Sequence, residues 1–453
     1  MKHTRAVAAA LVIVLLAASA CGRDEDSGED EETTSSTEAD GGDEGGDATA
    51  LADGGFGEME AVCQEGDASG STATGVTDTE IHVGTVTDKG GPVSGLNVEM
   101  YDAAVAFTEW CNDNGGILGR ELVLDDADAK LQEYEAAMTT ACEQDFALVG
   151  GGAVFDEDPN GVRVGCGLPN IAGYVVSEPA RTADLQVQPI PNPVDKIAIG
   201  RHPAAAAAYP DAVDHYGIMT SALPSVILVS DQLEDAATQA GFTIDYRVEY
   251  APINETGWDN FAREIKDKGI KVLEYVGQPA DLVLLSEALD TAGYYPDVIL
   301  LSTNFIDEVY AEEVGDKAGN TFIQSVFHPM TMADDNKATQ DYLDLMEQYN
   351  PGGKVAQLGV QSVSAWLLFA KAAAECGSDL TAECLLEQAE AQEGWTGGGL
   401  HAEQTPGNEE PSECSLILTL TDGEFVYNEE ATRPTDDDGL FNCSPENVVT
   451  VGG

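Results

Sequence analysis

Basic residues are scarce in this sequence: only 20 of its 453 residues are Lys or Arg, against 82 Asp and Glu, which gives a formal charge of −62. Nucleic-acid binding depends on Lys and Arg side chains that neutralise phosphates, so nucleic acid is excluded as a partner. The same deficit argues against adhesion to anionic lipid through a basic patch. The acidity is compatible either with adaptation to salt or with a cationic ligand, and the sequence leaves this choice open.

The sequence also lacks an uninterrupted apolar run of 18 residues, so no ordinary membrane span is expected. It contains no G-x-S-x-G, H-E-x-x-H, C-x-x-C or G-x-x-x-x-G-K-[ST] motif. Its six histidines show no spacing typical of a metal site. We therefore expect a protein that is not an enzyme and that binds no metal or other cofactor. An extracellular hydrolase built from carboxylates that cluster only in space stays an alternative.

The first 21 residues have the layout of a secretory signal. Met1–Arg5 is short and basic, Ala6–Ala20 is uncharged and mostly apolar, and Cys21 follows. Ala17–Cys21 resembles a bacterial lipobox, which predicts removal of residues 1–20 and lipidation of Cys21. Plain secretion is the alternative. The expected location is extracytoplasmic, with the chain anchored to the bacterial cell membrane through its N-terminal lipid only.

Residues 21–75 are predicted to form an acidic, disordered linker. Residues 22–60 contain 15 acidic residues, one basic residue, and many Gly, Ser and Thr. Such a composition buries too little apolar surface to offset the entropy of ordering the chain. The linker would hold the folded part of the chain away from the membrane.

Nine cysteines are present, and lipidation of Cys21 leaves eight, an even number that suits disulfides in an oxidising compartment. Many pairings are possible. Judged by the elements that each pair would join, the expected disulfides are Cys63–Cys111, Cys142–Cys166, Cys376–Cys384 and Cys414–Cys443.

The body of the chain alternates between strand and helix patterns, which predicts an α/β fold with parallel sheets covered by helices on both faces. The first series has strands at 81–86, 122–124, 147–149 and 170–172, with helices at 100–111 and 133–145. The second series has strands at 225–230, 243–250, 271–276 and 298–301, with helices at 231–240, 258–268 and from Pro279. Later helices are expected at 356–375 and 381–392, and a hairpin at 416–420 and 425–427.

Open α/β sheets bind ligands beyond the carboxyl ends of their strands. In the first series these ends are the loops 87–95, 150–156 and 173–177, and in the second series they are 230–231, 277–279 and 302–306. If the two halves face each other, the six loops converge on one cleft.

Three stretches together resemble the leucine/isoleucine/valine-binding family of ABC-transporter substrate-binding proteins. They are Asn112–Leu122, which contains N-x-x-G-G-I-x-G-R, then Asp125–Ala127, and Asp145–Gly152. The likeness covers about residues 76–430. It implies a type I periplasmic-binding fold, with two doubly wound parallel sheets joined by a three-strand hinge. Lobe one would comprise 76–195 plus about 321–400, and lobe two 196–320 plus about 401–453.

The resemblance also implies that the loop after the third strand grips a ligand carboxylate. Here that loop has no hydroxyl side chain, and Tyr275–Pro279 has no acidic residue to meet an ammonium group. The ligand class therefore extends from amino acids to amides and small carboxylates. Each aromatic candidate could instead be ordinary packing, and Asp88 could anchor its loop rather than meet a ligand. The predicted ligand-binding residues are Asp88, Gly151, Gly152, Ala153, Val154, Phe155, Gly173, Tyr174, Val175, Gln278, Asn304 and Phe305.

These observations predict a monomeric, extracytoplasmic solute-binding lipoprotein of an ABC importer. Its partners would be a small polar molecule, trapped between the lobes, and the permease subunits. A sensory or adhesion lipoprotein with the same fold and no transport role is the alternative.

Overall fold

The first half of the chain folds into a parallel sheet with the strand order β2-β1-β3-β4-β5. In this computed structural model, residues 50–91, 95–315, 320–436 and 439–452 are described, so the predicted signal and Cys21 lie outside the described residues. The strands of the first sheet are β1 (Glu80–Thr87), β2 (Glu121–Asp128), β3 (Ala147–Val149), β4 (Asn170–Ile171) and β5 (Gln186–Val187). Their helices are α1 (Val98–Asp113), α2 (Tyr134–Gln144), α3 (Val162–Cys166), α4 (Glu178–Arg181), α10 (Lys337–Tyr349), α11 (Gln357–Cys376) and α12 (Ala382–Glu390). We call this sheet with its helices the first lobe.

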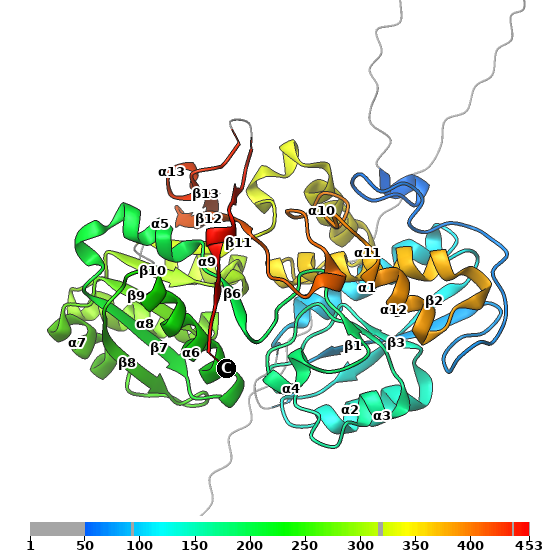
Figure 1. Ribbon diagram of the computed structural model, residues 1–453, viewed down its shortest axis with the longest axis horizontal. Helices are drawn as coiled ribbons and strands as arrows, with labels where there is room; N and C mark the ends of the chain where they lie inside the picture. Colours follow the sequence, from blue (N-terminus) through cyan, green and yellow to red (C-terminus); the bar gives the residue numbers. More distant parts are fainter. Residues whose placement is uncertain (1–49, 92–94, 316–319, 437–438, 453) are drawn as a thin grey trace, which may run out of the picture. The chain divides into compact units, whose positions relative to one another are not determined.

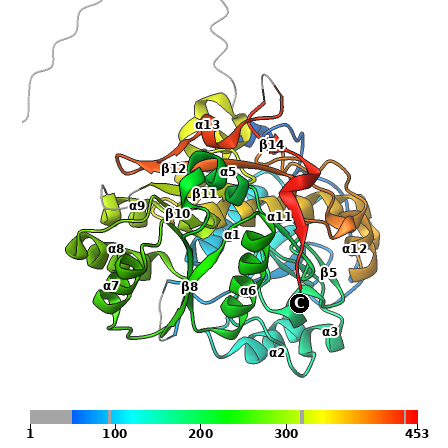
Figure 2. The ribbon, with the colours of Figure 1, turned by 60° about the vertical axis from the view of Figure 1, so that its left-hand side comes forward.

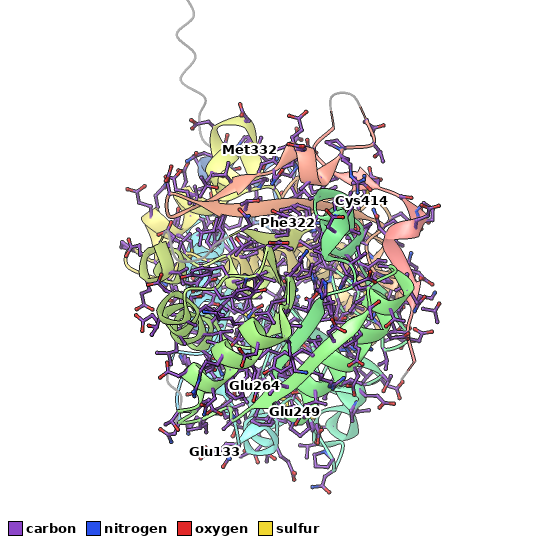
Figure 3. All side chains as sticks on the ribbon, turned by 90° about the vertical axis from the view of Figure 1, so that its left-hand side faces the viewer. Glu133, Glu249, Glu264, Phe322, Met332 and Cys414 are labelled. Carbon is purple, nitrogen blue, oxygen red and sulfur yellow. A yellow bond between two sulfur atoms is a disulfide. The ribbon has the colours of Figure 1, made fainter. Side chains whose placement is uncertain are left out.

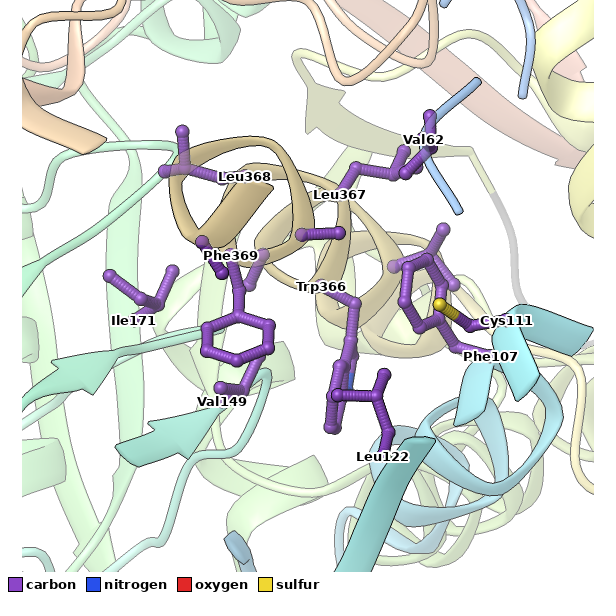
Figure 4. Close-up of a cluster of buried hydrophobic side chains, with 14 of the residues drawn as sticks. Val62, Phe107, Cys111, Leu122, Val149, Ile171, Trp366, Leu367, Leu368 and Phe369 are labelled. Carbon is purple, nitrogen blue, oxygen red and sulfur yellow. The ribbon is translucent and has the colours of Figure 1, made fainter. Parts of the chain in front are cut away.

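Apolar side chains cover both faces of the first sheet. Helices α1 and α11 lie side by side on one face, and α2 covers the other (Figure 1). Figure 4 shows Phe369 of α11 packed toward Val149 of β3 and Ile171 of β4, and Trp366 of α11 beside Leu122 of β2. A helix as apolar as α11 needs such burial on most of its surface.

The second sheet contains eight strands in the order β13-β12-β11-β10-β9-β7-β8, with β14 paired to β12. Its strands are β7 (Tyr216–Ser221), β8 (Ile244–Tyr250), β9 (Val272–Val276), β10 (Val298–Leu301), β11 (Thr321–Ser325), β12 (Cys414–Thr421), β13 (Glu424–Tyr427) and β14 (Asn442–Cys443). Its helices are α5 (Arg201–Ala208), α6 (Pro224–Gln239), α7 (Trp258–Lys268), α8 (Pro279–Ala292), α9 (Glu308–Val314) and α13 (Glu429–Thr432). Helices α7 and α8 cover one face, and α5 and α6 the other (Figure 2). This is the second lobe.

The second sheet is mixed rather than purely parallel. Strands β7 to β11 run parallel, whereas β12 is antiparallel to both β11 and β13. The predicted hairpin is thus present, and it extends the sheet at one edge. Strand β11 belongs to this second sheet, so a lobe boundary placed at residue 321 would be a few residues early.

The chain passes between the two lobes three times. The first passage links β5 to β6 (Lys196–Ala198), which pairs with β15 (Val448–Thr450). The other two lie side by side, because the His328 N–H donates to Leu400 O and the Ala402 N–H to Val326 O, both at 2.9 Å. All described residues belong to one compact unit.

One strand prediction is wrong. Residues 225–230 open helix α6 and form no strand, and the predicted helix at 231–240 is only the second half of α6. The apolar run Val226–Val229 fits a buried strand and a buried helix equally well, and Pro224 at the first turn favours the helix. The strand that precedes α6 is β7, so the relevant loop is 222–223 rather than 230–231.

The linker prediction is wrong for residues 50–75. Leu51, Phe56, Val62 and Cys63 are buried in the core of the first lobe, and the Trp110 Nε1–H donates to Leu51 O at 2.9 Å. A few apolar anchors are enough to hold a segment whose average composition suggests disorder.

All four predicted disulfides are confirmed: Cys63–Cys111, Cys142–Cys166, Cys376–Cys384 and Cys414–Cys443. The acidic side chains are largely exposed, as the labelled Glu133, Glu249 and Glu264 illustrate (Figure 3). Within the described ranges, no helix has both the length and the hydropathy required to cross a bilayer.

Candidate functional site

Asp88 follows β1 directly and is fully buried. One carboxylate oxygen accepts the Leu131 N–H at 2.7 Å, and the other accepts the Val154 N–H at 2.6 Å. Burial raises the pKa of Asp88 in spite of these two bonds. Because both oxygens are occupied by main-chain donors, Asp88 braces the loop after β3 in the way expected of a loop anchor.

The glycine-rich loop after β3 allows close approach of its neighbours. A Cβ on Gly151 would lie 2.4 Å from Val86 O, and one on Gly152 would lie 2.5 Å from the ring of Tyr174. The Gly152 N–H donates to Val86 O at 2.9 Å. Two N–H groups of this loop, those of Gly152 and Val154, are therefore already used inside the protein. Ala153 is buried among the side chains beneath α2.

Two aromatic residues stand at the ends of β3 and β4. Phe155 and Tyr174 are both half-buried, and the Tyr174 ring lies against Gly152. The Tyr174 hydroxyl is hydrogen-bonded to the Asn97 side chain, and burial raises the pKa of this phenol well above its ordinary value. These rings can present an apolar wall and one hydroxyl to a ligand.

The loop after β4 is fixed by two side-chain amides from elsewhere in the chain. Gln361 Nε2 donates to Gly173 O at 2.6 Å, and Asn192 Nδ2 donates to Val175 O at 3.0 Å. Val175 itself is buried. Neither amide belongs to a pattern that sequence reasoning detected, because both act across long separations.

The second-lobe candidates lie in different environments. Gln278 is half-exposed at the N-cap of α8. Asn304 donates from Nδ2 to Gly277 O at 3.1 Å and accepts from Ser302 Oγ at 2.6 Å, so it ties two strand-end loops together. Phe305 is fully buried, with its ring between Tyr275 and Tyr310 at 5.8 and 5.6 Å. Phe305 is therefore part of the second-lobe core and not of an open surface.

The structure brings the strand-end loops of the two lobes into contact. Ser225 Oγ, in the first turn of α6, donates to Val154 O at 3.0 Å. Strands β7, β9 and β10 are parallel neighbours, so their carboxyl ends share one edge of the second sheet. That edge carries Ser225, Gln278 and Asn304, and the opposing edge of the first lobe carries the loops after β1, β3 and β4.

Sequence reasoning missed a charged cluster at the same junction. Lys354 Nζ lies 2.6 Å from Asp307 Oδ2 and 3.4 Å from Glu99 Oε2, and the Gln357 N–H donates to Ile306 O at 3.2 Å. Burial raises the pKa of Glu99, against the opposing effect of Lys354. No local pattern marks these residues, because the cluster combines three distant segments.

One buried pair resembles part of a hydrolase site. Ser364 Oγ lies 2.8 Å from His401 Nε2 and accepts the Trp395 Nε1–H at 3.1 Å. His401 Nδ1 faces Ala402 O at 2.8 Å rather than a carboxylate, and burial lowers the pKa of His401 to about 4. Because both side chains are buried, the pair fixes the third passage between the lobes. The described residues include no cluster of three or more His, Cys, Asp or Glu suited to a metal ion.

Residues 204–424 match the family model of the periplasmic binding proteins. Over this span, which is slightly less than half of the chain, the sequence is similar to the periplasmic binding proteins. This confirms the resemblance noted from the sequence, and it accords with two α/β lobes whose strand-end loops meet. No curated protein shows significant sequence similarity to this chain.

Solved structures show the same type I periplasmic-binding fold. A leucine-binding protein of Thermotoga maritima superposes with a TM-score of 0.63 at 14% identity, over 77% of this chain and 97% of the other. A fatty acid ABC transporter substrate-binding protein of Thermomonospora curvata gives 0.63 at 14%, over 83% and 96%. A solute-binding protein of Rhodopseudomonas palustris in complex with 3,4-dihydroxybenzoic acid gives 0.62 at 12%, over 77% and 95%. At these identities the likeness establishes the fold alone.

Proposed function

We propose that this protein is the extracytoplasmic receptor of an ABC importer and that it traps one small solute between its lobes. The observation that carries this proposal is the contact of opposing strand-end loops at Ser225 and Val154. A solute that touches both lobes only when they meet binds that arrangement preferentially, and it thereby shifts the equilibrium between open and closed forms.

The charged side chains near the candidate site are already paired within the protein. This supports an uncharged polar solute, such as an amide, over a zwitterionic amino acid or a carboxylate. Asp88 is bound to main-chain N–H groups, and Lys354 is paired with Glu99 and Asp307. Two of the donors that a carboxylate would need are used internally. A buried ligand charge without a counter-charge is costly, whereas an uncharged solute requires only hydrogen bonds and apolar contact.

A thermal-shift screen of amides, amino acids and small carboxylates on the secreted chain from Gly22 tests this function. Stabilisation by amides is expected, and the absence of a shift with every solute would contradict solute binding. Tyr174→Ala should weaken binding of the best solute about tenfold or more, with little change in melting temperature, because the ring is half-buried. Tyr427→Ala, a half-buried tyrosine on β13, is the control and should bind normally.

We also propose that the chain is anchored through a lipid on Cys21. Cys21→Ser should move the protein from the membrane fraction to the soluble fraction, because a single lipid-bearing residue would be its only attachment. Continued retention in the membrane fraction would exclude this anchor.

A further inference from the structure

Gln232 is a second-lobe residue whose side chain bonds only outside its own lobe. It lies on α6 and is fully buried. Its Oε1 accepts Arg181 Nη1 of the first lobe at 2.9 Å, and its Nε2 donates to Val194 O in the first passage between the lobes. A buried side-chain amide destabilises the protein unless its polar groups are hydrogen-bonded. These two bonds therefore stabilise the arrangement in which the lobes meet.

Arg181 continues this chain of bonds toward the candidate site. Its Nη2 donates to Asn192 Oδ1 at 2.8 Å, and Asn192 Nδ2 donates to Val175 O at 3.0 Å. Burial lowers the pKa of Arg181 to about 10, so the side chain stays charged at neutral pH. Three hydrogen bonds thus connect Gln232, through Arg181 and Asn192, to the main chain one residue after Tyr174.

A second set of contacts fixes Arg181 to the same loop. The carboxylate of Asp156 is buried and accepts the Val176 and Ser177 N–H groups at 2.6 and 2.9 Å. Ser177 Oγ then caps the short helix α4, which ends at Arg181. A displacement of the loops after β3 and β4 would therefore displace Arg181 as well.

We propose that Arg181 and Gln232 form a clasp that couples the loop Gly173–Ser177 to the arrangement of the two lobes. The link to solute binding rests on the proposed function, but the coupling itself does not. When the clasp is formed, the loop 173–177 and helix α6 restrict each other's motion. A solute that orders the loop therefore also favours the closed form, in which the two lobes meet. Both are positioning residues, since neither is placed in contact with the solute.

Hydrogen exchange on the ligand-free secreted chain tests the clasp. Gln232→Leu, a change in the second lobe, should accelerate exchange of the amides of 173–177 in the first lobe about tenfold, because the intervening bonds are lost. The reciprocal variant Asn192→Ala, which does not touch α6 through the described bonds, should accelerate exchange in residues 225–232. Gln239→Leu is the matched control: it lies on the same face of α6, is exposed, and contacts Thr450 O.

The clasp would be contradicted if, in Gln232→Leu, the exchange rates of the amides of 173–177 stayed within twofold of those of the parent protein. It would also be contradicted if Gln239→Leu accelerated exchange of these amides as much as Gln232→Leu does. If Gln232→Leu fails to fold, Arg181→Lys keeps the charge but loses the forked contact, and it should give the same acceleration. No solute is needed for either readout. Failure of the solute screen with intact coupling would therefore contradict only the proposed function.

Discussion

Each lobe buries a carboxyl group, but the two groups are treated in opposite ways. In the second lobe, Glu274 is fully buried and receives Arg201 Nε and Nη2 at 3.0 and 2.8 Å, Tyr216 OH at 3.0 Å, and His202 Nε2 at 3.1 Å. Burial alone would raise the pKa of Glu274, but Arg201 and His202 lower it to about 2. The second lobe thus keeps a buried charge by surrounding it with donors.

In the first lobe, Asp145 is almost fully buried beside another acid, Asp125. Burial, reinforced by Asp125, raises the pKa of Asp145 to about 8. Asp125 is itself 3.0 Å from His82 Nδ1, whereas no Lys or Arg pairs with Asp145 among the described residues. A buried carboxyl group therefore contributes stability in one lobe and costs stability in the other, depending on its partners.

The lobes also differ in covalent support. Three of the four disulfides link segments of the first lobe, whose strands β3, β4 and β5 have only two or three residues. Short strands provide few ladder hydrogen bonds, and cross-links destabilise the unfolded chain instead. The comparison predicts that the second lobe depends on buried charge and the first on its disulfides.

Removal of the buried carboxylate should have the largest effect. Glu274→Leu should lower the free energy of unfolding by about 3–5 kcal/mol, because Arg201 and His202 would stay buried without their partner. Urea unfolding measures the loss. The exposed pair Lys371–Glu375 provides the control, since Glu375→Gln should cost less than about 1 kcal/mol. If Glu274→Leu lowered the free energy of unfolding as little as the control does, the second lobe would not depend on its buried charge.

Removal of first-lobe disulfides should come next, graded by loop length. Replacing Cys63 and Cys111 with Ser opens a loop of 48 residues and should cost about 4 kcal/mol. The same change at Cys376 and Cys384 opens a loop of 8 residues and should cost about 2.5 kcal/mol. Equal losses in urea unfolding, or a larger loss for the shorter loop, would contradict this order.

The smallest change is a gain. Asp145→Asn should stabilise the protein by roughly 2–3 kcal/mol at pH 7, because the neutral amide avoids the cost of the buried carboxyl. The folded chain binds the Asp145 proton more tightly than the unfolded chain does. The stability that protonated Asp145 contributes to the folded state is therefore fully present below about pH 4, and it is lost as the pH rises toward 8. The gain should vanish near pH 4 and grow up to pH 8 in urea titrations, and a gain independent of pH would contradict the assignment.

Much of the architecture could be predicted from the sequence. The predictions for β3, α7 and β10 match to the residue, and the four disulfide pairs are as expected. These features depend on local periodicity, on capping residues, and on cysteines that flank well-predicted elements. The candidate site was predicted only to the level of its loops, because a side chain such as Phe305 can face a ligand or the core from the same position in a loop.

The sequence by itself determined the acidic character of the chain, the alternation of strands and helices, and the loops that follow the strands. Tertiary structure alone decided that residues 225–230 are helical, that residues 50–75 pack on the first lobe, and that Arg181 meets Gln232. The physical reason is separation along the chain. Local propensity acts over a few residues, whereas burial and hydrogen-bond partners depend on segments that only the fold brings together.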